Sequence, residues 1–164
     1  CDVLRAEGLL AKLGIKWPND VFFQDRKVCG ILIESPGGSA PAKDRLVIGI
    51  GINVNNSCQN APDGIRMLGT ALCDVTGRQH DPQELLVRLL CALAERIQPL
   101  RSHDISELVQ TWQQLDLLAG KQVVLEADDQ AIDGKCVEIA HDGALVLETT
   151  LGRRRFYSGS VRPA

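Results

Sequence analysis

Apolar residues recur at helical spacing in four segments of the chain. In the first segment an apolar residue returns every three or four positions up to Gly14, which predicts a helix that ends at this glycine. A second, short helix is predicted over residues 65–76, and Gly77 ends it in the same way. The apolar face of the first helix consists of Val3, Ala6, Leu10 and Leu13.

Two further helices are marked by the residues at their starts. The dipeptide Asp81-Pro82 predicts a helix start, because aspartate caps free backbone N–H groups and proline fits the first turn. This helix runs to about residue 98 and is stopped by Pro99, and the next helix begins at Asp104 or Ser106. Their apolar stripes consist of Leu85, Leu86, Leu89, Leu90, Leu93 and Ile97 in the former, and of Leu108, Val109, Trp112 and Leu115 in the latter.

Strand patterns lie between the first and second helices. Residues 17–35 predict a β-hairpin with its turn at 24–26, because two apolar runs flank a polar Gln-Asp-Arg break. Residues 36–44, PGGSAPAKD, have the composition of a flexible loop, and residues 45–55 form the next predicted strand. The first part of the chain therefore combines helices with a sheet.

The apolar pattern changes to a period of two after Ala119-Gly120. Short apolar strands then alternate with turn signals, and Asp142-Gly143 is a clear hairpin signal among them. Residues 119–164 therefore predict a small SH3-like β-barrel of five strands, and residues 1–118 a separate domain with helices and a mixed sheet. The expected fold class is α+β.

Composition narrows the functional class. The chain has 164 residues, of which 45% are hydrophobic and 24% charged, with a net charge of −3. This is the mix of an ordinary globular protein, and it lacks the strongly basic face of a nucleic-acid-binding protein. No apolar run approaches the roughly 20 residues that span a bilayer, so we expect no membrane contact.

The cysteines and histidines suggest no metal site. None of the six cysteines belongs to a Cys-x-x-Cys pair, and several lie in apolar periodic segments. We interpret them as reduced, buried thiols of a cytoplasmic protein, with disulfides or a zinc site as the alternative. His80, His103 and His141 are isolated in loop-like segments, and we assign them no role.

The segment VIGIGINVN, residues 47–55, combines a strand pattern with two glycines. Alternate side chains of a strand face opposite ways, which puts Gly49, Gly51 and Asn53 on one face. Glycine weakens a strand and often marks close approach by a ligand or another backbone. Two interpretations stay open. The two glycines leave space for a ligand to lie on the strand, and Asn53 forms hydrogen bonds with an amide-like edge of that ligand. Alternatively, the glycines allow tight packing against a helix.

The strand KVCGILIE, predicted over 27–35, carries one charge at its start. Strand alternation places Lys27 on the face of Ile31, and Gly30 interrupts the side-chain cover midway. A single ammonium at the mouth of an apolar slot suits a phosphate or a carboxylate. The alternative is a solvated turn lysine, which is the usual place of lysine in proteins.

The motif KWPND, residues 16–20, supplies Asp20 just before the hairpin. Asn19-Asp20 favours a local turn through side chain–backbone hydrogen bonds, so Asp20 can be explained by the turn alone. Taken together, KWPND, KVCGILIE and GIGINVN, in this order and spacing, resemble the catalytic core of biotin–protein ligases, including the bifunctional ligase/repressor group. The resemblance continues through TWQQLDLLAGKQV into the C-terminal strands.

The resemblance implies two coupled half-reactions. Biotin attacks the α-phosphate of MgATP to give biotinyl-adenylate, and a lysine of a carrier protein then takes the biotinyl group. Lys27 matches the family's lysine near the biotin carboxylate and the α-phosphate. Asp20 matches an aspartate that orients or deprotonates the incoming amine. Mg²⁺ arrives with ATP, and we identify no protein ligand for it.

The resemblance also assigns the binding residues. Gly49 and Gly51 match the floor of the biotin site, and Asn53 matches the residue that meets adenine. The remaining residues of the ligand slot are Gly30, Ile31 and Leu32. The implied partner is the biotin carboxyl carrier domain of a biotin-dependent carboxylase.

Family features that precede these motifs are missing from the sequence: strands that help to bind biotin, an arginine/glycine-rich loop over the adenylate, and a DNA-binding winged helix. We therefore expect an incomplete, weakly active or inactive ligase, with no nucleic-acid contact through this chain and a tendency to form a homodimer. The C-terminal YSGSVRP also lacks the family's acidic residue after its glycine.

Two alternatives stay open for the activity: a lipoate–protein ligase-like enzyme and a non-catalytic module that binds carrier proteins. The arginine triplet of residues 153–155 likewise has two interpretations. It is a solvated strand edge, or a patch that steers an acidic carrier domain and loses that effect at high salt.

Overall fold

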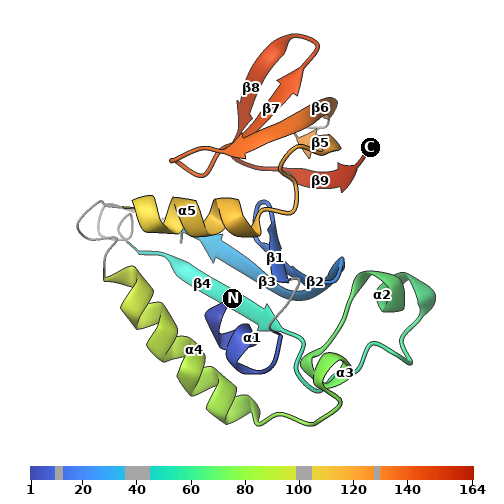
Figure 1. Cartoon of the computed structure of the whole chain (residues 1–164), viewed down its shortest axis with the longest axis vertical. Coiled ribbons are helices and arrows are strands. Elements are labelled where there is room, and N and C mark those ends of the chain that lie inside the picture. The colour runs from blue at the N-terminus through green and yellow to red at the C-terminus, as the bar shows by residue number, and fades with distance from the viewer. Residues whose placement is uncertain (10–12, 36–44, 99–104, 128–129) are drawn as a thin grey trace. The chain divides into compact units, whose positions relative to one another are not determined.

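The computed structural model describes residues 1–9, 13–35, 45–98, 105–127 and 130–164 (Figure 1). The chain forms two compact units, each with its own core. Unit 1 consists of Cys1–Leu13 and Asn19–Leu85, and unit 2 of Gly14–Pro18 and Leu86–Ala164. The predicted boundary between residues 118 and 119 falls inside unit 2.

Unit 1 is built on three antiparallel strands. β2 (Asp20–Phe23) and β3 (Arg26–Glu34) form the predicted hairpin, and β4 (Val47–Ile52) pairs with β3. The turn residues Gln24 and Asp25 have φ values of 48° and 65°, as a two-residue type I′ turn requires. The hairpin prediction is therefore confirmed.

The first predicted helix is wrong in its length. Helix α1 (Asp2–Ala6) ends well before Gly14, because the chain reverses at Gly8, whose φ of 110° is left-handed. Leu9 then turns into the core of unit 1, where it is fully buried beside Leu4. Leu13 begins strand β1 (Leu13–Lys16) instead of ending a helix.

The helix predicted over 65–76 is two helices. α2 (Asp63–Leu68) ends at Gly69, whose backbone is extended, and α3 (Leu72–Thr76) begins after Ala71. The break arises because the Thr70 N–H donates to the carbonyl of Lys27 in β3, and not to a helical carbonyl. Gly77, with a φ of 70°, ends α3 as predicted.

Helix α4 (Pro82–Ile97) starts as predicted. The Asp81 carboxylate accepts hydrogen bonds from the N–H groups of Gln83 at 2.8 Å and Glu84 at 3.4 Å. Of its apolar stripe, Leu85 is buried, whereas Leu86, Leu90 and Ile97 are exposed. Pro99 and Asp104 lie outside the described residues.

A buried histidine joins three parts of unit 1. His80 Nδ1 lies 2.8 Å from Glu7 Oε2, and Nε2 lies 2.7 Å from Thr76 Oγ1. Its backbone N–H and C=O pair with the side-chain amide of Asn55. His80 therefore links the end of α1, the end of α3 and the loop after β4, a structural role that its isolated place in the sequence does not reveal.

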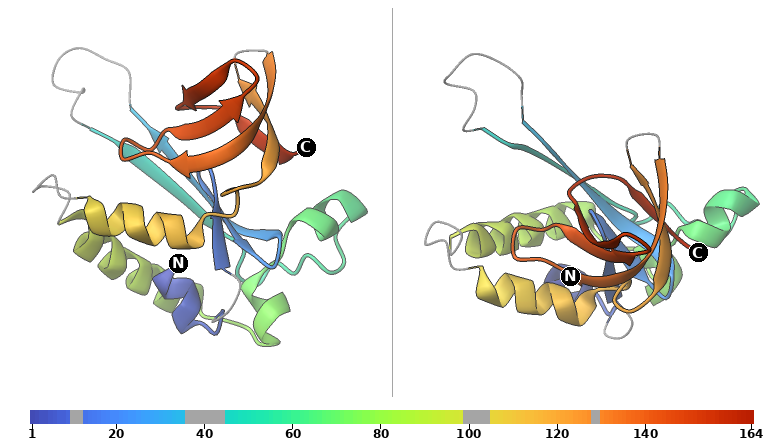
Figure 2. Two further views of the ribbon diagram at one scale, coloured as in Figure 1. Left: turned by 45° about the horizontal axis from the view of Figure 1, so that its top comes forward. Right: turned by 90° about the horizontal axis from the view of Figure 1, so that it is seen from above.

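Unit 2 contains five antiparallel strands in the order β8-β7-β6-β5-β9, curled strongly on themselves (Figure 2). The predicted five strands are confirmed, and closure of the curled sheet into a barrel stays a prediction. Helix α5 (Ser106–Leu115), also predicted, packs near β6. The strands are β5 (Gln122–Ala127), β6 (Gln130–Ile139), β7 (Leu145–Thr149), β8 (Gly152–Phe156) and β9 (Ser160–Pro163).

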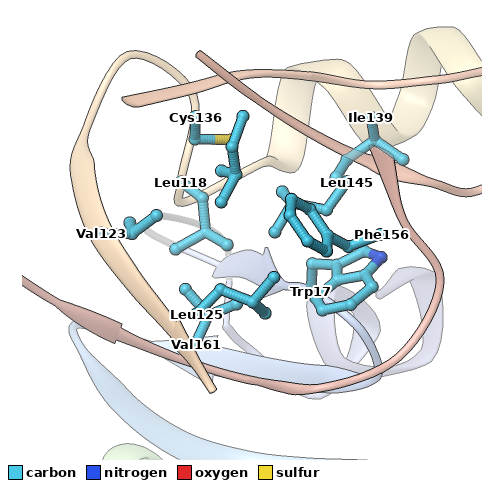
Figure 3. Close-up of a cluster of buried hydrophobic side chains, with 10 residues drawn as sticks. Trp17, Leu118, Val123, Leu125, Cys136, Ile139, Leu145, Phe156 and Val161 are labelled. Carbon is cyan, nitrogen blue, oxygen red and sulfur yellow. The ribbon is translucent and has the colours of Figure 1, made fainter. Parts of the chain in front are cut away.

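The core of unit 2 includes a residue from far earlier in the chain. Trp17 is buried among the side chains of the C-terminal strands, next to Leu125 and Phe156 (Figure 3). Its indole N–H donates to the carbonyl of Gly143 at 3.0 Å, in the β6–β7 turn. Gly14 lies close to Leu117, where a Cβ would come within 2.3 Å of a leucine methyl carbon. Residues 14–18 are thus part of unit 2.

No helix within the described residues is long and apolar enough to cross a membrane. The six cysteines are all free thiols. Burial raises the pKa of Cys136, in the core of unit 2, to about 12. This cysteine therefore acts as a small apolar core residue.

We expect Trp17→Phe to lower the free energy of unfolding by about 1–3 kcal/mol, because it leaves the Gly143 carbonyl without its donor. Trp112→Phe is the matched control, since the indole N–H of Trp112 is buried and has no hydrogen-bond partner among the described residues. Urea unfolding of both variants measures the difference. An equal loss in both would show that ring volume, and not the hydrogen bond, carries the effect.

Candidate active site

A pocket of unit 1 has a volume of about 500 Å³ and lies between β3, the end of β4 and helix α2. It brings together Lys27, Gly30, Gly51 and Asn53 of the predicted site residues. Ile31, Leu32, Gly49 and Asp20 are not part of its wall. The lining consists of Lys27, Val28, Cys29, Gly30, Gly51, Ile52, Asn53, Gly64, Ile65, Leu68 and Gly69.

A β-bulge decides which way Lys27 points. Strands β2 and β3 pair Asp20 with Gly30 and Phe22 with Lys27, so between these pairs β3 has one residue more than β2. The extra residue reverses the alternation of side chains, and Lys27 therefore shares the face of Gly30 and Asp20. The predicted placement of Lys27 beside Ile31 is wrong, because Ile31 packs against the core of unit 1.

Lys27 and Asp20 form an ion pair over Gly30. Nζ of Lys27 lies 2.6 Å from Oδ1 of Asp20, and both side chains are partly exposed. A Cβ on Gly30 would lie 3.1 Å from this Nζ and 3.3 Å from this Oδ1, closer than ordinary contact. Glycine at this position leaves the space in which the two charges meet. The carboxylate of Asp20 is thus part of a charge pair at the pocket.

The glycines of β3 and β4 form a bare strip on this same face. Gly30 pairs with Gly51, and Leu32 pairs with Gly49. A Cβ on Gly51 would find its nearest neighbour, the Gly30 carbonyl, at 4.0 Å, and a Cβ on Gly49 would find the Leu32 carbonyl at 3.8 Å. No helix among the described residues approaches them this closely, so helix packing does not explain these glycines there.

Asn53 is held firmly at the end of the strip. Its Nδ2 donates to the carbonyl of Thr70 at 3.1 Å, and its Oδ1 accepts from Asn56 Nδ2 at 3.1 Å. Its backbone N–H donates to the carbonyl of Val28, and its own carbonyl accepts from the N–H of Leu72. An asparagine amide has two donor hydrogens and two acceptor lone pairs, so one of each is left for a ligand.

Helix α2 supplies a wall that the sequence did not assign to the site. Ile65 and Leu68, one helical turn apart, line the pocket and are 57% and 69% exposed. Their spacing in the predicted helix was visible, but nothing in it distinguished a pocket wall from a core-facing stripe. Apolar side chains beside a charged strand suit a ligand with an apolar, planar part and an anionic part.

The pocket's remaining groups offer no metal site or nucleophile. Burial raises the pKa of the Cys29 thiol, which keeps it protonated at neutral pH. Within the described ranges, no three His, Cys, Asp or Glu side chains lie together as metal ligands. Among the described residues, the pocket wall therefore offers one ammonium and one amide, and the Asp20 carboxylate adjoins that ammonium.

The arginine triplet favours the solvated-edge interpretation. Arg153 pairs with Glu148 at 2.9 Å and Arg155 with Asp142 at 2.6 Å, while the guanidinium of Arg154 lies over the ring of Phe156. Each arginine thus has a partner within the C-terminal unit, and exposed pairs of this kind contribute little stability.

Two family models match the chain: the biotin/lipoate A/B protein ligase family over residues 5–53 and the biotin protein ligase C terminal domain over residues 119–162. The crystal structure of biotin protein ligase from Aquifex aeolicus is 30% identical, with a TM-score of 0.81 over 99% of this chain and 73% of that chain. The chain belongs to the biotin protein ligase family. The resemblance noted in the sequence and the α+β fold class are both confirmed.

Other biotin protein ligases share the similarity. The A. aeolicus enzyme in complex with biotin and ATP is 29% identical, with a TM-score of 0.81 over 99% of this chain and 68% of that chain. The bifunctional ligase/repressor BirA of Bacillus spizizenii is 28% identical over 163 residues, 97% of this chain and 50% of the relative. The biotin–[acetyl-CoA-carboxylase] ligase of Paracoccus denitrificans is 32% identical over 152 residues, 90% of this chain and 61% of the relative. The chain thus spans about half the length of the curated relatives it matches.

Gly51→Val tests whether the bare strip holds a ligand. Valine favours strands and its Cβ has room here, so we expect the melting temperature to change little while biotin binding is lost. Gly49→Val makes the same change two pairs along the strands, outside the pocket wall, and reports how far the ligand extends. Calorimetry and thermal melts measure both. Unchanged biotin binding in Gly51→Val, or its unfolding, would contradict the ligand-floor interpretation.

Proposed function

We propose that the protein acts as a biotin–protein ligase, which activates biotin to biotinyl-5′-AMP with ATP and transfers biotin to a lysine of a biotin carboxyl carrier domain. The observation that carries this proposal is the Lys27–Asp20 ion pair, held over the bare Gly30–Gly51 pair beside an apolar pocket. The similarity to the A. aeolicus enzyme in complex with biotin and ATP supports the choice of substrates.

Lys27 acts in the first half-reaction. A biotin carboxylate oxygen bonds to the α-phosphorus of ATP, the bond from that phosphorus to the bridging oxygen breaks, and pyrophosphate leaves. Negative charge spreads over the α-phosphate oxygens during this exchange, and a fixed ammonium stabilises it. Before the substrates bind, the Asp20 carboxylate holds Lys27 at the edge of the pocket, with its Oδ1 2.6 Å from the Lys27 Nζ. The anionic groups of the substrates then replace part of this contact.

Asp20 acts in the second half-reaction. The carrier's lysine nitrogen bonds to the biotinyl carbonyl carbon, the bond to the AMP oxygen breaks, and the amine loses a proton. The Asp20 carboxylate lies beside the ammonium of Lys27 and therefore beside the acyl phosphate that Lys27 contacts. It orients the incoming amine and accepts its proton.

The remaining groups hold the two halves of the adenylate. Gly30, Gly51 and Gly49 form the floor under biotin, and Asn53 reads adenine through its spare donor and acceptor. Ile65 and Leu68 cover the apolar adenine ring from α2. Mg²⁺ enters with ATP and needs no cluster of protein ligands.

Biotin is favoured over lipoate by the C-terminal unit. Its match to the biotin protein ligase C terminal domain extends over residues 119–162, beyond the region that the biotin/lipoate family model covers. The carrier partner, a homodimer and a cytoplasmic location are further parts of the proposal. The name of the Paracoccus relative gives acetyl-CoA carboxylase as the protein that it modifies.

Lys27→Ala should lower the rate of biotinyl-adenylate formation by roughly 10²–10³-fold, the scale for one fixed charge-stabilising group. The assay is biotin-dependent pyrophosphate release, in a form of the protein that carries this chain and makes the adenylate. Lys135→Ala, which removes an exposed lysine of β6, is the control and should leave the rate unchanged. A near-normal rate of adenylate formation in Lys27→Ala would show that Lys27 is a solvated turn lysine with no role in this step.

Asp20→Asn should separate the two half-reactions. Amide replaces carboxylate without loss of shape, so adenylate formation should persist while transfer to the carrier falls by roughly 10²–10⁴-fold, the range for a lost general base. Single-turnover transfer from preformed adenylate to a biotin carrier domain measures this. If adenylation falls as far as transfer, Asp20 serves to place Lys27 and does not accept the amine proton.

A further inference from the structure

Helix α2 cannot hold its own position by burial. None of its six residues is buried, although Ile65 and Leu68 form one wall of the pocket. A helix this short has little stability of its own in water. Its position therefore depends on the segments at its two ends, residues 56–62 before it and Gly69–Ala71 after it.

One carboxylate connects both ends. Asp74, in the first turn of α3, accepts hydrogen bonds from the Ser57 hydroxyl and from the Cys58 N–H at 2.8 Å, both before α2. It also accepts from the Ala71 N–H at 3.3 Å, which lies after α2. Burial opposes the charge of Asp74, but these donors outweigh it and hold the pKa of this carboxyl below its usual range.

The same contacts reach the residue that faces the ligand. Asn56, next to Ser57, donates to Oδ1 of Asn53, and Nδ2 of Asn53 donates to the carbonyl of Thr70, next to Ala71. Both neighbours of the Asn53 amide thus adjoin a donor of Asp74. If Asp74 served only to cap helix α3, its hydrogen bond with the Ala71 N–H would be enough. Its hydrogen bonds with Ser57 and Cys58 therefore have a different role.

We propose that Asp74 is a positioning residue for the nucleotide: its carboxylate fixes both ends of the α2 segment, and so sets the α2 wall and the Asn53 amide in place before ATP binds. This inference rests on the proposed function, in that ATP is taken as the ligand of this wall. Asp74 itself lies outside the pocket lining and acts through Ser57, Cys58 and Ala71.

The first test needs no ligand. In Asp74→Asn, one oxygen acceptor becomes an NH₂ donor that faces other donors. Amide hydrogen exchange across residues 58–71 should become about tenfold faster, the size of a lost cap, while exchange in β3 and β4 stays unchanged. Asp63→Asn is the matched control, since Asp63 is an exposed α2 residue that pairs with Arg66 of the same helix. It should leave exchange in the 69–71 segment unchanged.

The second test uses ATP. We expect Asp74→Asn to weaken ATP binding about tenfold, and saturating ATP to restore exchange protection in residues 58–71 to the wild-type level. Ser57→Ala should give a smaller loss, and adding it to Asp74→Asn should have no further effect, because Ser57 acts through Asp74.

Several outcomes would overturn the inference: unchanged exchange in residues 58–71 of Asp74→Asn, equal acceleration throughout β3 and β4, or unchanged ATP affinity despite faster exchange. The Ser57→Ala variant decides the question if Asp74→Asn does not fold. If a form of the protein that carries this chain together with the rest of the catalytic core does not bind ATP, the proposed function fails, and hydrogen exchange without ligand still decides whether Asp74 fixes the α2 segment.

Discussion

One extra residue in strand β3 controls the geometry of the candidate site. Without the bulge, Lys27 would fall on the face of Ile31, which packs into the core of unit 1. With it, the lysine lies on the opposite face, over Gly30 and 2.6 Å from Asp20. A charged lysine in the core would be strongly unfavourable, so the bulge both avoids that cost and delivers the ammonium to the pocket.

The glycines of β3 and β4, which have no side chain, matter to the site as much as its charged residues. Gly30 makes room for the ion pair, and Gly51 extends a bare strip of backbone along the same face. Glycine in a strand costs stability, and the apolar packing on the opposite face of these strands offsets it: Val28 and Cys29 are buried beside Leu72. Within the described residues of unit 1, these strands thus pack into a core on one side and leave the backbone at Gly49 and Gly51 open on the other.

The motif KWPND serves two different needs within five residues. Trp17 fills the core of unit 2 and bonds to the β6–β7 turn, whereas Asp20 begins β2 in unit 1 and pairs with the lysine. The loops around α2 are held differently, by polar contacts. Asp74 accepts hydrogen bonds from the segments on both sides of α2, and His80 in the same way links the end of α1 to the end of α3. Such networks position backbone only when every member is satisfied.

The sequence by itself determined the elements whose causes are local. The β2–β3 turn, the capped start of α4, the period-two strands of the C-terminal unit and the bare face of Gly49 and Gly51 all follow from short-range patterns, and three motifs together indicated the family. Tertiary structure decided what depends on distant partners. A β-bulge is defined by the pairing with a neighbouring strand. The face on which Lys27 lies therefore could not be predicted from the alternation of side chains along β3. The break between α2 and α3 needs the carbonyl of Lys27 in β3, and α1 ends early because Leu9 has a core to enter.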